Sequence, residues 1–143
     1  MKAYFGRRYL LSASHRLHAG SLSQAENRAL YGRCNNPHGH GHNYVVEVLA
    51  AGAVNPETGM VIDMAELDRA VRARVLERFD HMNLNLDPLF ARAVPTTENL
   101  CRAIYDLLVD QLAPARLERV RVEETENNFF EYEGSRDQGT GDH

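Results

Sequence analysis

Hydrophobic and polar residues alternate over residues 2–17, a pattern that predicts a long strand with one buried face. Residues 40–51 and residues 117–125 each predict a further strand, because both are rich in β-branched or alternating apolar residues. Turn-forming residues occupy positions 55–59, so residues 60–63 are expected to return antiparallel to the second strand as a short third one. The pattern therefore predicts four strands, of which the second and third form an antiparallel hairpin.

Apolar residues recur every three or four positions in two later segments, which predicts two amphipathic helices. Asp63 and Thr96 precede these segments and are expected to cap the helix N-termini. Because the two helices follow each other without a strand between them, the order indicates an α+β domain with both helices on one face of the sheet. The apolar stripes consist of Met64, Leu67, Val71, Val75 and Phe79 in the first helix and of Leu100, Ile104, Leu107, Leu108 and Leu112 in the second.

Composition narrows the class of protein. A chain of 143 residues with 43% hydrophobic and 25% charged residues predicts one domain at residues 1–133 and a disordered tail at 134–143. The net charge of −4 argues against nucleic-acid binding, which requires a basic surface. No apolar run reaches the length of a membrane span and no signal-peptide core is evident, so we expect a cytoplasmic protein. Its two cysteines, Cys34 and Cys101, are expected to be free thiols.

The densest candidate chemistry lies in residues 34–44, which contain Cys34 and three histidines. On a strand, His38, His40 and His42 would point to the same side, and two neighbouring histidines can bind one metal ion. Catalytic zinc takes three protein ligands and keeps a position open for water or substrate, so a third ligand must come from elsewhere. His15, at the end of the first strand, and His18, three residues later, are the two candidates.

Two further sites have open interpretations. The adjacent Asp80 and His81 could form a pair in which the carboxylate fixes the imidazole tautomer, although adjacency alone is weak evidence. Alternation places Glu124 on the apolar face of its strand, where a carboxylate needs a partner. The alternative is that the strand has ended and Glu124 is solvated.

Five short motifs occur along the chain: Ser12-Ala-Ser-His15, Cys34-Asn-Asn-Pro with Gly39-His-Gly-His-Asn-Tyr44, Asp80-His81 followed by Asn83-Leu84, Pro95-Thr-Thr-Glu-Asn99, and Glu124-Thr125. In this order and approximate spacing they resemble the 6-pyruvoyl-tetrahydropterin synthase family, which also contains the 6-carboxytetrahydropterin synthases of queuosine biosynthesis. The resemblance extends over residues 4–132. Each motif alone is weak evidence, whereas the five together are specific.

This resemblance implies a tunnelling fold: a four-stranded antiparallel sheet with two helices on one face. Three copies of this subunit would assemble into a barrel. Two trimers stack into a hexamer, and the active sites lie between subunits. Pairing of edge strands between copies would also protect the open edges of so small a sheet.

The resemblance also implies roles for individual residues. His38 stands where relatives often have another residue, so it is not expected to be a ligand. Cys34 would be the catalytic base; its ordinary thiol pKa is about 8.5, so it needs a cation or a basic partner. The implied site consists of His15, His40 and His42 as zinc ligands, Cys34, Asp80 and His81 as catalytic residues, and Thr96, Thr97, Glu98 and Glu124 as pterin-binding residues, with Glu124 as the anchor.

The implied activity is zinc-dependent elimination of triphosphate from 7,8-dihydroneopterin triphosphate, which gives 6-pyruvoyl-tetrahydropterin. The carboxy branch starts from the same substrate and also releases acetaldehyde. Cys34 precedes His40 by six positions, which resembles the pyruvoyl branch, whereas the arginine-rich, bacterial-looking composition resembles the other. A non-catalytic pterin or metal-binding module is the alternative from another class, but it would not need Cys34 or the pair Asp80 and His81. The zinc hydrolase motif His-Glu-x-x-His does not occur.

Overall fold

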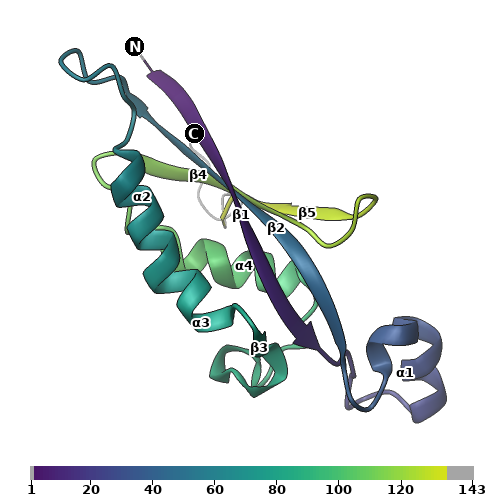
Figure 1. The fold of residues 1–143 in the computed structure, drawn as a ribbon. Helices are drawn as coiled ribbons and strands as arrows, with labels where there is room; N and C mark the ends of the chain where they lie inside the picture. Colours follow the sequence, from purple (N-terminus) through teal and green to yellow (C-terminus); the bar gives the residue numbers. More distant parts are fainter. Residues whose placement is uncertain (1, 135–143) are drawn as a thin grey trace.

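A computed structural model describes residues 2–134 of the chain, which form a five-stranded sheet with helices along one face (Figure 1). The strand order is β3-β1-β2-β4-β5. The strands are β1 (Lys2–His15), β2 (His40–Ala53), β3 (Met82–Asn83), β4 (Arg116–Glu123) and β5 (Phe129–Tyr132).

The long antiparallel pair of β1 and β2 forms the centre of the sheet. Their register begins with Lys2 opposite Ala53 and continues to His15 opposite His40. On the helix side, alternate residues such as Leu11 and Tyr44 are buried, which confirms the alternation seen in the sequence. Because the register is fixed by this buried face, the last residue of β1 is held against the first residues of β2.

Two helical segments cover this buried face, as the apolar stripes predicted. Helix α2 (Met64–Val71) continues through a π-helical turn (Arg72–Leu76) into α3 (Glu77–Phe79), and α4 (Thr97–Leu108) follows later in the chain. The carboxylate of Asp63 caps α2 and the hydroxyl of Thr96 caps α4, so both predicted N-caps are confirmed. Met64 is the exception in the predicted stripe: it is 45% exposed, because it lies in the first turn beyond the edge of the core.

The connection between β1 and β2 contains helix α1 (Gln24–Tyr31) and a 3-10 turn (Gly32–Asn35). A capping box at Ser23 starts α1. The backbone N–H of Leu17 donates to the carbonyl of Cys34 at 2.6 Å. This connection therefore brings Cys34 back beside the end of β1.

The predicted strand at residues 60–63 is wrong. The turn at residues 55–59 forms, but the chain then enters α2 directly, and β2 already has β1 on one side and β4 on the other. No edge of β2 is left for a hairpin partner. The short additional strand is β3 instead, which pairs in parallel with β1 at Ala13 and Ser14.

The sheet is consequently mixed and five-stranded rather than four-stranded and antiparallel. Its fifth member, β5, pairs antiparallel with β4. The sheet is not closed into a barrel within one chain. Within residues 2–134, no helix has both the length and the apolarity that crossing a membrane requires. The predicted disordered tail lies outside the described residues, apart from Gly134.

One ion pair fastens the segment between α3 and α4. Arg78 donates to both carboxylate oxygens of Asp87, at 2.8 and 2.9 Å, and Asp87 also accepts from the backbone N–H of Leu89 at 2.9 Å. The hydrogen bonds from Arg78 hold the pKa of Asp87 below its ordinary value. This contact orders the start of the loop that later supplies Pro95 to the functional site.

Replacement of Asp87 by Asn is expected to lower the free energy of unfolding at pH 7 by roughly 1.5 to 3 kcal/mol, the range for hydrogen bonds to charged groups. Because the folded pKa is depressed, this stabilisation is present above the unfolded pKa of about 3.9 and is lost as the pH falls through the folded pKa. Urea unfolding of both proteins from pH 7 to pH 3 tests this. A difference in unfolding free energy that stays constant down to pH 3 would contradict it.

Candidate functional site

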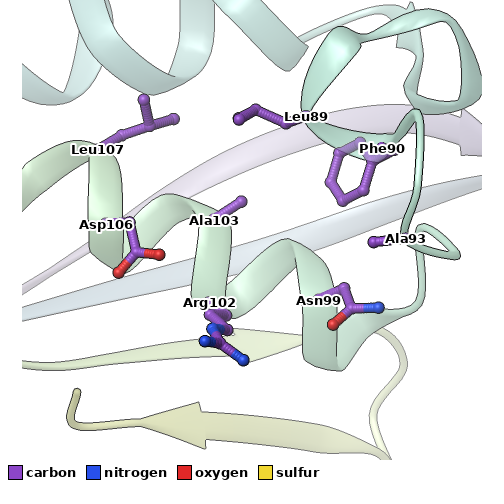
Figure 2. Close-up of a pocket in the computed structure, with 8 residues that line it drawn as sticks. All are labelled: Leu89, Phe90, Ala93, Asn99, Arg102, Ala103, Asp106 and Leu107. Atoms are coloured by element: carbon purple, nitrogen blue, oxygen red, sulfur yellow. The ribbon is translucent and has the colours of Figure 1, made fainter. Parts of the chain in front are cut away.

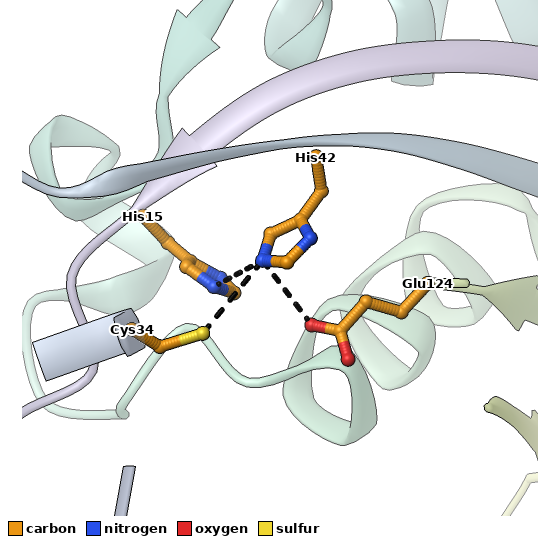
Figure 3. A group of neighbouring side chains, drawn as sticks. All are labelled: His15, Cys34, His42 and Glu124. Carbon is orange, nitrogen blue, oxygen red and sulfur yellow. Dashed lines mark hydrogen bonds and ion pairs between the residues drawn. The ribbon is translucent and has the colours of Figure 1, made fainter. Parts of the chain in front are cut away.

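Four side chains from four separate segments converge at one end of the sheet (Figure 3). His15 ends β1, Cys34 lies in the 3-10 turn, His42 lies near the start of β2 and Glu124 follows β4. One ligand atom from each lies within 4.8 Å of every other. From Nε2 of His42 the distances are 3.0 Å to Nε2 of His15, 3.7 Å to Sγ of Cys34 and 3.5 Å to Oε2 of Glu124.

The two imidazoles of this group are held in their neutral form. Burial lowers the pKa of His15 and also that of His42, where the Glu124 carboxylate opposes the effect only in part. His15 is fully buried, and its Nδ1 lies 2.9 Å from the carbonyl oxygen of Pro95. A carbonyl only accepts hydrogen bonds, so Nδ1 carries the hydrogen and Nε2 presents its lone pair to the group.

The donor atoms of the group fit a metal ion. Nε2 of His42 faces a nitrogen lone pair, a sulfur atom and a carboxylate oxygen, so it needs a proton or a cation at the centre. Two nitrogen ligands at about 2.0 to 2.1 Å from a tetrahedral zinc ion lie about 3.3 Å apart. The observed 3.0 Å between the Nε2 atoms of His15 and His42 is close to this value. The group can thus hold a divalent ion with little rearrangement.

His40 lies outside this group of four, although the family resemblance implies that it is a metal ligand. Its ring packs edge to face on that of His42 with 4.6 Å between the centroids, the same separation as between His15 and His42. The ring of His42 therefore contacts both other imidazoles. His38 is exposed and lies outside the group.

Cys34 is half-buried beside these imidazoles. Burial raises the pKa of its thiol, the Glu124 carboxylate raises it further, and the charge of Arg33 acts in the opposite direction. A thiol in this setting is protonated at neutral pH, so a positive charge nearby is needed before it can accept a proton from a substrate.

Glu124 borders both the group of four and a polar cavity of about 370 Å³. Strand β4 ends at Glu123, but Glu124 is not solvated, because its side chain is only 20% exposed and faces His42. Thr97 and Glu98, from the first turn of α4, line the same cavity together with Asn127 and Asn128. The Thr96 hydroxyl instead accepts the Asn99 N–H as the cap of α4. The cavity thus collects three of the four predicted pterin-binding residues.

Asp80 and His81 form a pair at the outer side of β1. His81 Nδ1 lies 3.1 Å from the Asp80 carboxylate, whose other oxygen accepts the Ser12 N–H at 2.9 Å. The His81 side chain is 81% exposed, and its backbone φ of 62° is unusual for a residue other than glycine. Neither residue belongs to the group of four among the described residues. The pair exists as predicted, and neither of its members has a hydrogen bond or ion pair with Cys34 among the described residues.

Gly39 is required where the chain turns into β2. Its φ is 84°, and a Cβ there would lie 3.2 Å from the carbonyl oxygen of His15. At Gly41 the backbone φ is ordinary and an added Cβ would meet nothing within 4 Å. The two glycines of the same motif therefore differ in what they tolerate.

We expect Gly39→Ala to destabilise the fold by about 1 to 2 kcal/mol through its left-handed backbone, and to weaken metal binding by displacing His15. Gly41→Ala is the matched control and is expected to change both quantities little. Thermal unfolding and titration of each metal-free protein with zinc measure the two effects. Equal behaviour of the two variants would show that the close approach of Gly39 to His15 is unimportant.

A second cavity, of about 300 Å³, lies between α4 and the loop at residues 88–93 (Figure 2). Its walls are mainly apolar, including Leu89, Phe90 and Leu107, and its charged side chains are Arg102 and Asp106. It contains none of the four converging residues, so we place the chemistry at the group of four.

Comparison with known proteins agrees with this geometry. The family model for 6-pyruvoyl tetrahydropterin synthase matches residues 5–135. The human 6-pyruvoyl tetrahydrobiopterin synthase is 46% identical over 134 residues, which cover 93% of this chain and 92% of the human one.

Two further relatives extend the comparison. The structure of Caenorhabditis elegans 6-pyruvoyl tetrahydropterin synthase aligns with a TM-score of 0.88 at 42% identity, covering 94% of this chain and 97% of the other. A putative 6-carboxy-5,6,7,8-tetrahydropterin synthase of Archaeoglobus fulgidus is 41% identical over 92 residues, which cover 64% of this chain and 73% of that protein. The chain therefore belongs to the 6-pyruvoyl tetrahydropterin synthase family.

Proposed function

We propose that this protein is a zinc-dependent lyase that eliminates triphosphate from 7,8-dihydroneopterin triphosphate and yields 6-pyruvoyl-tetrahydropterin. The observation that carries the proposal is the convergence of His15, His42, Cys34 and Glu124, which combines metal ligands, a base and a carboxylate. High identity to enzymes named as 6-pyruvoyl tetrahydrobiopterin synthases over nearly the whole chain supports the same activity.

The metal site of the proposal consists of His15, His40 and His42. The rings of His15 and His40 both contact the ring of His42, with equal centroid separations of 4.6 Å, which supports this set. Imidazole nitrogen is a preferred ligand of zinc. Bound zinc would act as a Lewis acid toward oxygens of the substrate side chain.

In this proposal Cys34 removes a proton from the substrate side chain. The thiol lies next to the imidazoles, and positive charge at the group of four would oppose the burial that raises its pKa. His81, oriented by Asp80, would relay the proton, and its exposure at the edge of β1 suits a residue that serves the site of a neighbouring copy.

Glu124 is proposed to anchor the pterin ring by accepting hydrogen bonds from the ring amine and ring N–H. The polar cavity that it shares with Thr97 and Glu98 supports this role. Thr96 would contribute by fixing the start of α4, which presents those two residues.

We further propose a hexamer made of two stacked trimers, each trimer a closed barrel. The outer edge of β5 and most of the outer edge of β1 have no partner strand among the described residues, since β3 covers only Ala13 and Ser14. Pairing of such edges between copies would satisfy their backbone groups and close the barrel.

Incubation of the purified protein with 7,8-dihydroneopterin triphosphate tests the activity. Release of triphosphate without acetaldehyde is expected. Acetaldehyde as a product would assign the carboxy activity instead, an alternative that the similarity to the archaeal relative favours. Binding of the pterin without any turnover would identify a non-catalytic binding module.

A further inference from the structure

The fully buried Tyr44 lies behind the imidazoles of the group of four. It follows His42 by two positions on β2, so its side chain lies on the same face of the strand. Its hydroxyl oxygen is 3.3 Å from Nδ1 of His15, and its ring packs at a tilt against the ring of His42, with 5.5 Å between centroids. One tyrosine thus contacts both imidazoles on the side away from the group's centre.

The contacts at Nδ1 of His15 determine which nitrogen carries the hydrogen. The Pro95 carbonyl at 2.9 Å requires an N–H at this position, and the Tyr44 hydroxyl oxygen can accept from the same N–H as a second, longer partner. Tyr44 lies inside β2, and Pro95 lies directly before Thr96, the N-cap of α4. His15 is therefore fixed in one tautomer and one orientation by groups that do not belong to the group of four.

We propose that Tyr44 is a positioning residue for the metal centre, holding His15 together with the Pro95 carbonyl so that Nε2 faces the ion. The inference rests on the proposed function, because it concerns how that centre is prepared for its metal. Hydrogen bonds to the far nitrogen of a ligand histidine fix its tautomer and raise its basicity, and their loss typically weakens metal binding by about 10- to 100-fold.

Tyr44→Phe removes only the hydroxyl and keeps the ring that packs on His42. We expect the dissociation constant for zinc, measured by competition with a chromophoric chelator, to rise about tenfold. Tyr9→Phe is the matched control, since Tyr9 lies on the same face of β1 but donates to Asp68 at 2.7 Å, far along the strand from His15. The control is expected to bind zinc like the wild-type protein.

A second measurement reads the tautomer directly in the metal-free protein. Long-range ¹H–¹⁵N correlation spectra of the wild-type protein are expected to place the His15 hydrogen on Nδ1. A hydrogen on Nε2 would overturn the inference, and so would equal zinc affinity of Tyr44→Phe and Tyr9→Phe. Failure of the wild-type protein to bind zinc would instead refute the proposed function, because the metal-free tautomer is measured without any ion.

Discussion

Replacement of Cys34 by Ala is expected to lower turnover of 7,8-dihydroneopterin triphosphate by roughly 10²- to 10⁴-fold, the range for loss of a general base. Metal and pterin binding are expected to survive, because the proposed metal ligands and Glu124 are unchanged. The measurements are steady-state kinetics, metal content and the affinity for a pterin that lacks the triphosphate.

Cys101→Ala is the matched control for this variant. Cys101 is fully buried on α4, where its thiol donates to the carbonyl of Val120, and burial raises its pKa to about 12. It can act neither as a base nor as a ligand, so its loss is expected to leave turnover near the wild-type value. Wild-type turnover by Cys34→Ala would show that the base is another residue.

The second large effect is the return of activity in mixed oligomers, which is expected if each active site takes residues from two chains. Cys34→Ala and His81→Ala are each expected to be nearly inactive. When both are co-expressed with different tags and the mixed oligomers are purified, activity should return, because some sites receive Cys34 from one copy and His81 from another. Random assembly would restore about a quarter of the sites.

A mixture of Cys34→Ala with His42→Ala is the control for this experiment. Both residues belong to the same group on one chain, at 3.7 Å from each other, so mixing cannot restore a complete group. If the mixture of Cys34→Ala with His81→Ala also stays inactive, the assignment of His81 to a neighbouring copy is wrong. The exposure of His81 within a single chain would then need another explanation.

Periodicity predicted those parts of the fold in which burial on one face determines the structure. The alternation in β1 and β2 and the stripes in α2 and α4 are confirmed because their side chains fill one core. The strand predicted at residues 60–63 was wrong and β3 was not predicted, because the position of a short strand depends on which sheet edge is free, and that depends on distant segments. A four-residue segment such as 60–63 carries no information about which sheet edge is free.

The sequence predicted those parts of the site that consist of side chains with distinctive chemistry, such as histidine, cysteine and glutamate. Motif resemblance selected His15, Cys34, His42 and Glu124, and the structure brings them together. It also selected His40 as a ligand, which the group of four does not include, and Thr96, whose hydroxyl serves as a helix cap.

The Pro95 carbonyl escaped prediction because every residue has a carbonyl, and only the fold shows which one meets His15. Tyr44 could have been predicted to share a face with His40 and His42, because it continues their alternation. Its contact with His15 on β1 could not be predicted from the sequence. Contacts between distant segments thus account for what the residues alone did not reveal.

The proposed reaction requires imidazoles that hold a metal ion while the neighbouring thiol stays free to act as a base. X-ray absorption spectroscopy of the zinc-loaded protein tests this most directly. We predict nitrogen and oxygen scatterers at about 2.0 to 2.1 Å and no sulfur at about 2.3 Å. A sulfur scatterer at that distance in every site would make Cys34 a ligand and contradict its role as the base.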